Sequence, residues 1–96
     1  MERDFKGVWI PKEIWLDEKL STLEKVIFCG ILHFSHDKNM CYESNSSLSE
    51  FCQCSETKIS KAISKLIGLG YVYTERFNGR QRAIVIDTEW VVGVQK

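Results

Sequence analysis

The spacing of apolar residues along this chain changes once, at Gly68-Leu69-Gly70. Before this point, apolar residues recur every three or four positions, which is the spacing of one face of a helix. After it, residues 71–77 and 80–86 are rich in aromatic and β-branched side chains, which favour strands. A chain that passes from helices to a pair of strands is predicted to form an α+β fold, and its 96 residues suffice for a single domain.

A capping box marks the start of the first long helix. In Ser21-Thr22-Leu23-Glu24, the serine and glutamate side chains can each accept a hydrogen bond from the other residue's backbone N–H. The apolar residues that follow predict a helix over 21–36; they are Leu23, Val26, Ile27, Gly30, Ile31 and Phe34. Residues 1–20 form an N-terminal extension, in which Pro11 favours a short helix to about Leu16. Met40-Cys41-Tyr42 is expected to be a short strand.

Two further helices separated by a tight turn are predicted over 47–67. Ser47-Leu48-Ser49-Glu50 has the pattern of a second capping box, and Gln53-Cys54 is expected to form the turn. Ser55 is suited to cap the next helix. The apolar face of that helix consists of Ile59, Ala62, Ile63, Leu66 and Ile67. The order of helix, tight turn and helix is that of a helix-turn-helix motif.

Asn78-Gly79 predicts that the two strands form a hairpin over 71–86. A type I′ turn needs positive φ at both central positions, and Asn-Gly is the pair that satisfies this most readily. A two-residue turn at Asn78-Gly79 would pair Phe77 with Arg80 and Arg76 with Gln81. Such a hairpin after a helix-turn-helix motif predicts a winged helix-turn-helix, which has a three-helix core and a C-terminal β-hairpin wing. Residues 87–96 are a tail without an assigned element.

The charge of the chain is zero overall but is unevenly distributed. Lysine and arginine together number 13, as do aspartate and glutamate. Residues 55–86, however, carry six basic residues and only two acidic ones, whereas residues 1–24 carry four basic and six acidic ones. Because phosphates are attracted by a local basic patch rather than by net charge, the second half of the chain is the candidate site for nucleic acid.

The candidate DNA contacts lie on the second helix of the motif and on the wing. Short hydroxyl side chains and lysines opposite the apolar face suit a helix that enters the major groove. The predicted contacts of this helix are Ser55, Thr57, Lys58, Ser60, Lys61, Ser64 and Lys65. The predicted contacts of the wing, to the DNA backbone or the minor groove, are Arg76, Asn78, Arg80, Gln81 and Arg82.

The sequence resembles the winged helix-turn-helix domains of plasmid and phage replication proteins and of related bacterial regulators. The resemblance is carried by residues 9–15 (WIPKEIW), 20–25 (LSTLEK), 41–45 (CYESN), 48–59 (LSEFCQCSETKI) and 66–72 (LIGLGYV). It implies binding of double-stranded DNA, in replication initiation or in transcription regulation. Such domains often have glycine in the turn where this chain has Gln53, and they tend to stand at the N-terminus of a longer chain.

Signals for other kinds of site are weak. Cys52 and Cys54 form a Cys-x-Cys pair rather than the usual Cys-x2-Cys knuckle, so the four cysteines are expected to be free thiols without a metal. The sequence contains no phosphate-binding glycine loop and no suggestive carboxylate pair, so neither an enzyme nor a cofactor is expected. No apolar run approaches the roughly 18 residues of a membrane span. We therefore expect a cytoplasmic, nucleoid-associated protein that does not bind a membrane.

The alternative function is that of a protein-protein interaction module. Trp9, Trp15 and Trp90 are three large aromatic residues in a small domain. Core packing would explain them, but they could also form an interface with a second copy, a further domain or another protein. The zero net charge supports this alternative, which would require exposed tryptophans and lysines held in ion pairs.

Overall fold

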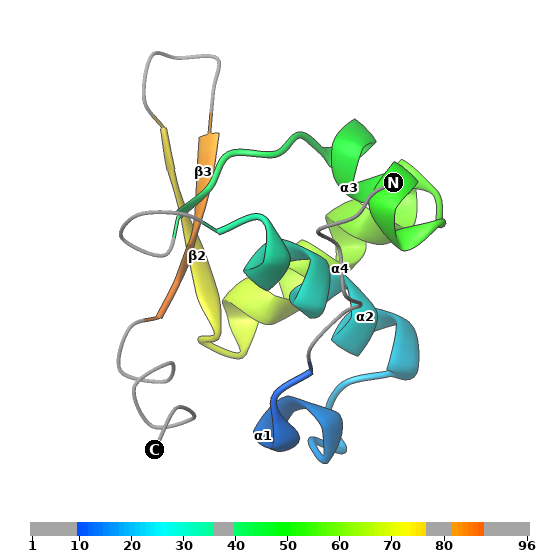
Figure 1. The fold of residues 1–96 in the computed structure, drawn as a ribbon. Coiled ribbons are helices and arrows are strands. Elements are labelled where there is room, and N and C mark those ends of the chain that lie inside the picture. The colour runs from blue at the N-terminus through cyan, green and yellow to red at the C-terminus, as the bar shows by residue number, and fades with distance from the viewer. Residues whose placement is uncertain (1–9, 36–39, 77–81, 88–96) are drawn as a thin grey trace.

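The computed structural model describes residues 10–35, 40–76 and 82–87, which form four helices and three strands. In chain order, the elements are α1 (Lys12–Trp15), α2 (Thr22–His33), β1 (Met40–Cys41), α3 (Asn45–Cys52), α4 (Glu56–Gly68), β2 (Val72–Arg76) and β3 (Arg82–Ile86). The helices lie against one face of a small antiparallel sheet (Figure 1). The α+β winged helix-turn-helix fold is thus confirmed. None of these helices is long and apolar enough to cross a membrane.

Serine side chains begin α2, α3 and α4. The capping box of α2 is confirmed, since Ser21 Oγ accepts from Glu24 N at 3.2 Å and Glu24 Oε1 accepts from Ser21 N at 2.8 Å. The predicted box at Ser47 is wrong, because α3 begins at Asn45. Its cap is Ser44, whose hydroxyl accepts from Ser47 N at 3.1 Å. Ser44 follows β1 by three residues and has the extended backbone conformation of an N-cap. The earliest serine of the run is therefore the cap, and Ser47 lies within the helix.

The turn between α3 and α4 is as tight as predicted. Gln53 adopts the left-handed conformation, with φ 58° and ψ 49°, and is the only non-glycine residue with positive φ in the described part of the chain. Cys54 N donates to Ser49 O at 3.1 Å and closes the turn. This backbone conformation explains why related domains often have glycine at this position, and it means that the glutamine is strained.

The register of the wing differs from the prediction by one residue. Arg76 pairs with Arg82, not with Gln81, and Val72 pairs with Ile86. In this register, Ile84 and Ile86 join Val72 in the core, whereas the predicted register would have placed Ala83 and Val85 on that face. Ala83 and Val85 are buried as well, on the opposite face, but the observed register gives the larger Ile84 and Ile86 to the main core. The five residues between the paired arginines, with the predicted turn at Asn78-Gly79, lie outside the described residues.

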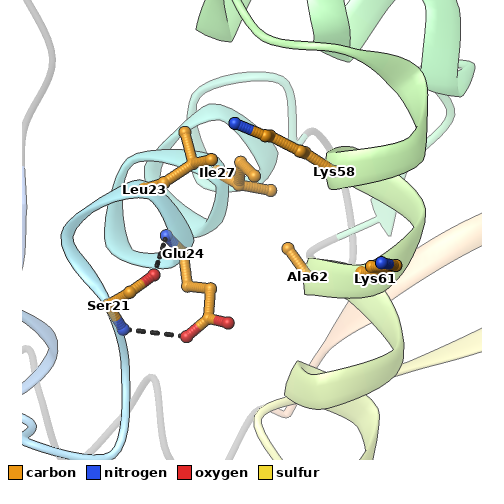
Figure 2. Close-up of a pocket in the computed structure, with 7 residues that line it drawn as sticks. All are labelled: Ser21, Leu23, Glu24, Ile27, Lys58, Lys61 and Ala62. Carbon is orange, nitrogen blue, oxygen red and sulfur yellow. Dashed lines mark hydrogen bonds between the residues drawn. The ribbon is translucent and has the colours of Figure 1, made fainter.

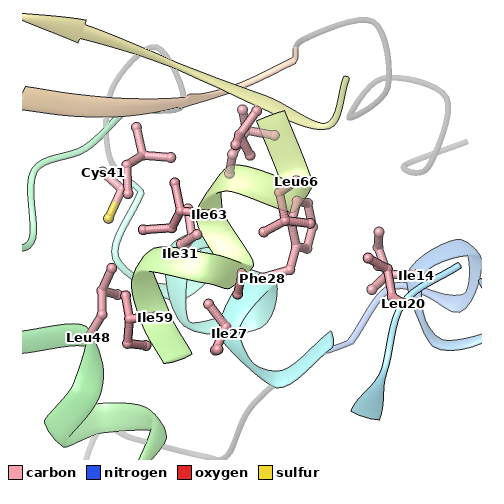
Figure 3. Close-up of a cluster of buried hydrophobic side chains, with 14 residues drawn as sticks. Ile14, Leu20, Ile27, Phe28, Ile31, Cys41, Leu48, Ile59, Ile63 and Leu66 are labelled. Carbon is pink, nitrogen blue, oxygen red and sulfur yellow. The ribbon is translucent and has the colours of Figure 1, made fainter. Parts of the chain in front are cut away.

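The core lies between the helices and the sheet (Figure 3). It is centred on Phe28 of α2, with buried side chains from every helix and strand. The helix α2 approaches α3 closely at Gly30, where an added Cβ would lie 3.1 Å from Cys52 Sγ. The segment after α1 is fixed to the rest of the domain through Asp17, whose carboxylate accepts a hydrogen bond from the Tyr71 hydroxyl. These contacts fix the position of α4.

Candidate nucleic-acid interface

The exposed face of α4 contains the side chains predicted to contact DNA. Ile59, Ala62, Ile63 and Leu66 are buried, so the opposite side of the helix faces solvent. The structure exposes all seven predicted residues of this region, namely Ser55, Thr57, Lys58, Ser60, Lys61, Ser64 and Lys65. Thr57, Lys61 and Ser64 lie most nearly opposite the buried face, at about 100° of rotation per residue. The helix therefore presents two hydroxyls and one ammonium group at its outermost line.

The N-terminal end of α4 is capped by Ser55. Its hydroxyl accepts from Lys58 N at 3.2 Å, so this side chain satisfies one of the free backbone N–H groups of the first turn. Ser55 thus has a structural role that is independent of any ligand. Its neighbour Thr57 is exposed in the first turn.

Lys65 is held in an ion pair with α2. Its Nζ lies 2.9 Å from Glu24 Oε1, the same oxygen that accepts from the backbone of Ser21. The Ser21 N–H and the Lys65 ammonium together hold the pKa of the Glu24 carboxyl below its ordinary value. The positive charge of Lys65 is thus partly neutralised, and this lysine also connects α4 to the start of α2.

Lys58 and Lys61 differ from Lys65, because no carboxylate of the described residues forms an ion pair with either of them. They lie beside a shallow groove of about 230 Å³ between α2 and α4 (Figure 2). The apolar lining of this groove consists of Leu23, Ile27 and Ala62. The two lysines are therefore exposed cations that remain available to an anionic partner.

Only part of the predicted wing contacts lie in the described residues. Asn78, Arg80 and Gln81 fall outside them, and Arg76 is placed only as the last residue of β2. Arg82 is half-buried, and its guanidinium donates to Asn45 Oδ1 and to the carbonyl oxygen of Glu43, the latter at 3.5 Å. Burial lowers the pKa of the guanidinium. Sequence reasoning missed these two partners, because neither the caps nor the apolar spacing indicates a contact between residues 37 and 39 positions apart.

The cysteines are free thiols, as predicted. Burial raises the pKa of Cys29 to about 12 and that of Cys52 to about 11, so these two groups remain protonated at neutral pH. Within residues 10–35, 40–76 and 82–87, no cluster of three or more histidine, cysteine, aspartate or glutamate side chains could hold a metal ion.

A separate apolar surface is present on α1. Trp15 is 51% exposed and the adjacent Leu16 is 61% exposed. Lys25 Nζ lies 5.2 Å from the centroid of the Trp15 ring, within the range of a cation–π contact. Trp9 and Trp90, which were predicted to share an interface with Trp15, lie outside the described residues.

Comparison with known proteins identifies similar domains. A family described as "Helix-turn-helix domain" matches residues 18–72. No curated protein matches the sequence at a significant level.

Three solved structures are similar in fold. The structure titled "N-Terminal domain of DNA binding protein" has a TM-score of 0.67 at 18% identity, covering 85% of this chain and 74% of its own. A variant of Lactococcus lactis ZitR in complex with DNA has a TM-score of 0.60 at 17% identity, covering 96% and 60%. Bordetella bronchiseptica BpsR, whose DNA binding is regulated by 6-hydroxynicotinic acid, has a TM-score of 0.59 at 15% identity, covering 83% and 53%. This chain thus spans little more than half the length of BpsR and ZitR.

Proposed function

This chain belongs to the family of helix-turn-helix domains, and we propose that it binds double-stranded DNA with α4 as the recognition helix. The observation that carries the proposal is the outward face of α4. Its exposed hydroxyls and lysines stand on a helix whose other side is fixed in the core. Because α4 packs on α2, α3 and β2, its exposed side chains are presented to a partner as one rigid row.

We propose that the short and the long side chains on this face contact different parts of the DNA. Thr57 and Ser64 are short enough to let the helix approach base edges in the major groove, where hydroxyls can donate or accept. Lys58 and Lys61 are long cations without an ion pair among the described residues, and they suit phosphate oxygens on either side of the groove. Lys65 would contribute less to DNA affinity, because its ammonium group is already paired with the Glu24 carboxylate.

The wing is proposed to contact the DNA backbone or the neighbouring minor groove. Its candidate residues are Arg76, Asn78, Arg80 and Gln81. The support is the antiparallel pairing of β2 with β3, because Arg76 ends β2 and the other three residues belong to the segment that connects the two strands. Arginine is the residue best suited to phosphate and to a narrow minor groove.

We propose transcription regulation as the role, and the support is that BpsR and ZitR, two proteins of similar fold, bind DNA. Replication initiation is the other role that this surface would serve, and it would require the same α4 face at an origin. Selection from a random duplex library gives the preferred binding sequence. The position of that sequence in the genome, at a promoter or at a replication origin, then separates the two roles. Either role places the protein at the nucleoid in the cytoplasm.

The test is the salt dependence of binding to a labelled duplex, measured by fluorescence anisotropy. Wild-type protein is expected to bind at low salt and to lose affinity steeply between about 50 and 200 mM salt, because cations are released from the phosphates. Lys61→Ala should lower the slope of log K against log salt by about 0.9, the value for one phosphate contact. Lys19→Ala, which removes an exposed lysine outside α4, is the matched control and should leave the slope unchanged. Absence of binding at the lowest salt would refute the proposal.

Binding of a protein partner or of a second copy of this chain is the second candidate function. The observation that favours it is the exposed pair Trp15 and Leu16 on α1. Sedimentation equilibrium on wild type and on Trp15→Ser decides whether this surface pairs two copies. A dimer that dissociates in the variant would support the interface, and a wild-type monomer at all concentrations would exclude the second copy.

A further inference from the structure

The side chain of Arg82 lies on the inner face of the wing. Successive residues of a strand point to opposite faces, so Arg82 shares its face with Ile84 and Ile86. Both isoleucines are fully buried in the core that the helices cover. Arg82 therefore points toward the helices rather than outward.

Two oxygens at the start of α3 receive the guanidinium. Arg82 Nη2 donates to Oδ1 of Asn45, the first residue of α3, and to the carbonyl oxygen of Glu43 at 3.5 Å. The pairing of β1 with β3 explains this geometry. Cys41 lies opposite Ile84, so continuing the register by two residues brings Glu43 opposite Arg82. The side chain thus links the base of the wing to the point where the chain enters the helix-turn-helix motif.

The link extends from α3 to α4. The two helices are joined by the tight turn at Gln53, which the hydrogen bond from Cys54 N to Ser49 O closes. They also pack directly on one another, with Leu48 of α3 and Ile59 of α4 both in the core. A contact that fixes β3 to the start of α3 therefore also fixes the wing relative to the outward face of α4.

We propose that Arg82 is a positioning residue for DNA binding, which sets the placement of the wing relative to α4 and makes no phosphate contact itself. The inference rests on the proposed function. Its physical basis is that two separate DNA contacts bind well together only when their spacing matches the duplex, so a residue that fixes the spacing raises affinity without adding a contact. Both hydrogen bonds come from Nη2, whose two N–H groups are fixed in the guanidinium plane, whereas the ammonium of lysine has rotatable donors on a flexible stem.

The experiment measures duplex affinity and its salt slope for Arg82→Gln, Asn45→Ala and the double variant, with circular dichroism used to establish that each is folded. We expect about a tenfold loss of affinity for Arg82→Gln, a salt slope equal to that of wild type, and partial rescue in Arg82→Lys. Because Arg82 acts through Asn45, the double variant should bind no more weakly than Arg82→Gln alone. Arg80→Gln, on the same wing, is the control for a proposed phosphate contact and should lower the slope by about 0.9.

Three results would overturn the proposal: a slope for Arg82→Gln that falls by about 0.9, an affinity equal to that of wild type, or additive losses in the double variant. Failure of the proposed function is distinguishable, since wild type itself would then not bind. In that case, amide hydrogen exchange still tests the contact. Faster exchange at residues 43–47 and 82–86 in both single variants would support the link, and unchanged exchange would refute it.

Discussion

Replacing Gln53 by glycine should stabilise the domain. Gln53 adopts the left-handed conformation, with φ 58° and ψ 49°, and its side chain is exposed. A residue with a Cβ loses roughly 1–2 kcal/mol in this region, because the Cβ approaches the carbonyl oxygen that follows. Glycine avoids this repulsion, but it loses about 0.5–1 kcal/mol more backbone entropy on folding. We therefore expect a net gain of about 0.5–1 kcal/mol in the free energy of unfolding.

The gain is measurable by thermal unfolding. For a domain of this size, each kcal/mol shifts Tm by about 4–8 °C, so Gln53→Gly should raise Tm by about 2–8 °C. Gln53→Ala is the matched control, because it removes the same side chain but keeps the Cβ. Its Tm should stay within about 2 °C of that of wild type.

The reasoning would be refuted by a Tm of Gln53→Gly equal to or below that of Gln53→Ala. Such a result would mean that the turn does not hold residue 53 at positive φ, or that the side chain stabilises the fold by more than its exposed position indicates. Urea unfolding of both variants checks that the slope of free energy against denaturant, and therefore the area exposed on unfolding, is unchanged.

Three further predictions follow from close contacts and charges in the fold. Gly30→Ala should destabilise the domain by about 1 kcal/mol in urea, because the new Cβ would lie 3.1 Å from Cys52 Sγ, an overpacking cost of about 1–3 kcal/mol of which the better helix propensity of alanine offsets about 1; equal or higher stability would show that the two helices can separate at little cost. Gly70→Ala should lower stability by about 1 kcal/mol, because Gly70 has φ +87°, and an unchanged urea midpoint would contradict that conformation. Because the pKa of Glu24 is lowered in the folded state, its contribution is present above the unfolded pKa and is lost as pH falls through the folded one. Wild type should therefore lose more stability than Glu24→Gln between about pH 5 and 3, and parallel pH profiles would contradict this.

Local signals predicted the helices well. The capping box at Ser21 and the serine cap at Ser55 depend only on hydrogen bonds between near neighbours in sequence, so the sequence contains all that they need. The buried face of α4 likewise follows from the spacing of its apolar residues, except at Ile67, which was predicted to lie on this face and is 40% exposed. In the run Ser44-Asn45-Ser46-Ser47 at the start of α3, by contrast, several caps are possible. The choice of Ser44 depends on where β1 ends, and this is decided by the pairing of β1 with β3, which is distant in sequence.

The wing shows what local signals omit. The register of β2 on β3 follows from which side chains the helices bury, and that information lies in residues 28–66 rather than in the hairpin. The one-residue difference decides the orientation of Arg82, which sequence analysis grouped with the DNA contacts and the structure places against Asn45. The outward face of α4 was predictable, whereas the partners of Lys65 and Arg82 on distant segments were not.

The most direct test of the central claim is to map a DNA duplex onto the protein by amide chemical-shift changes. The account predicts that the largest changes, on titration with a short duplex, occur along the exposed side of α4 at Thr57, Lys61 and Ser64. Amides of α1 should change little. Changes concentrated at Trp15 and Leu16, or no changes at all, would contradict the account, because the recognition helix would then not be the surface that meets DNA.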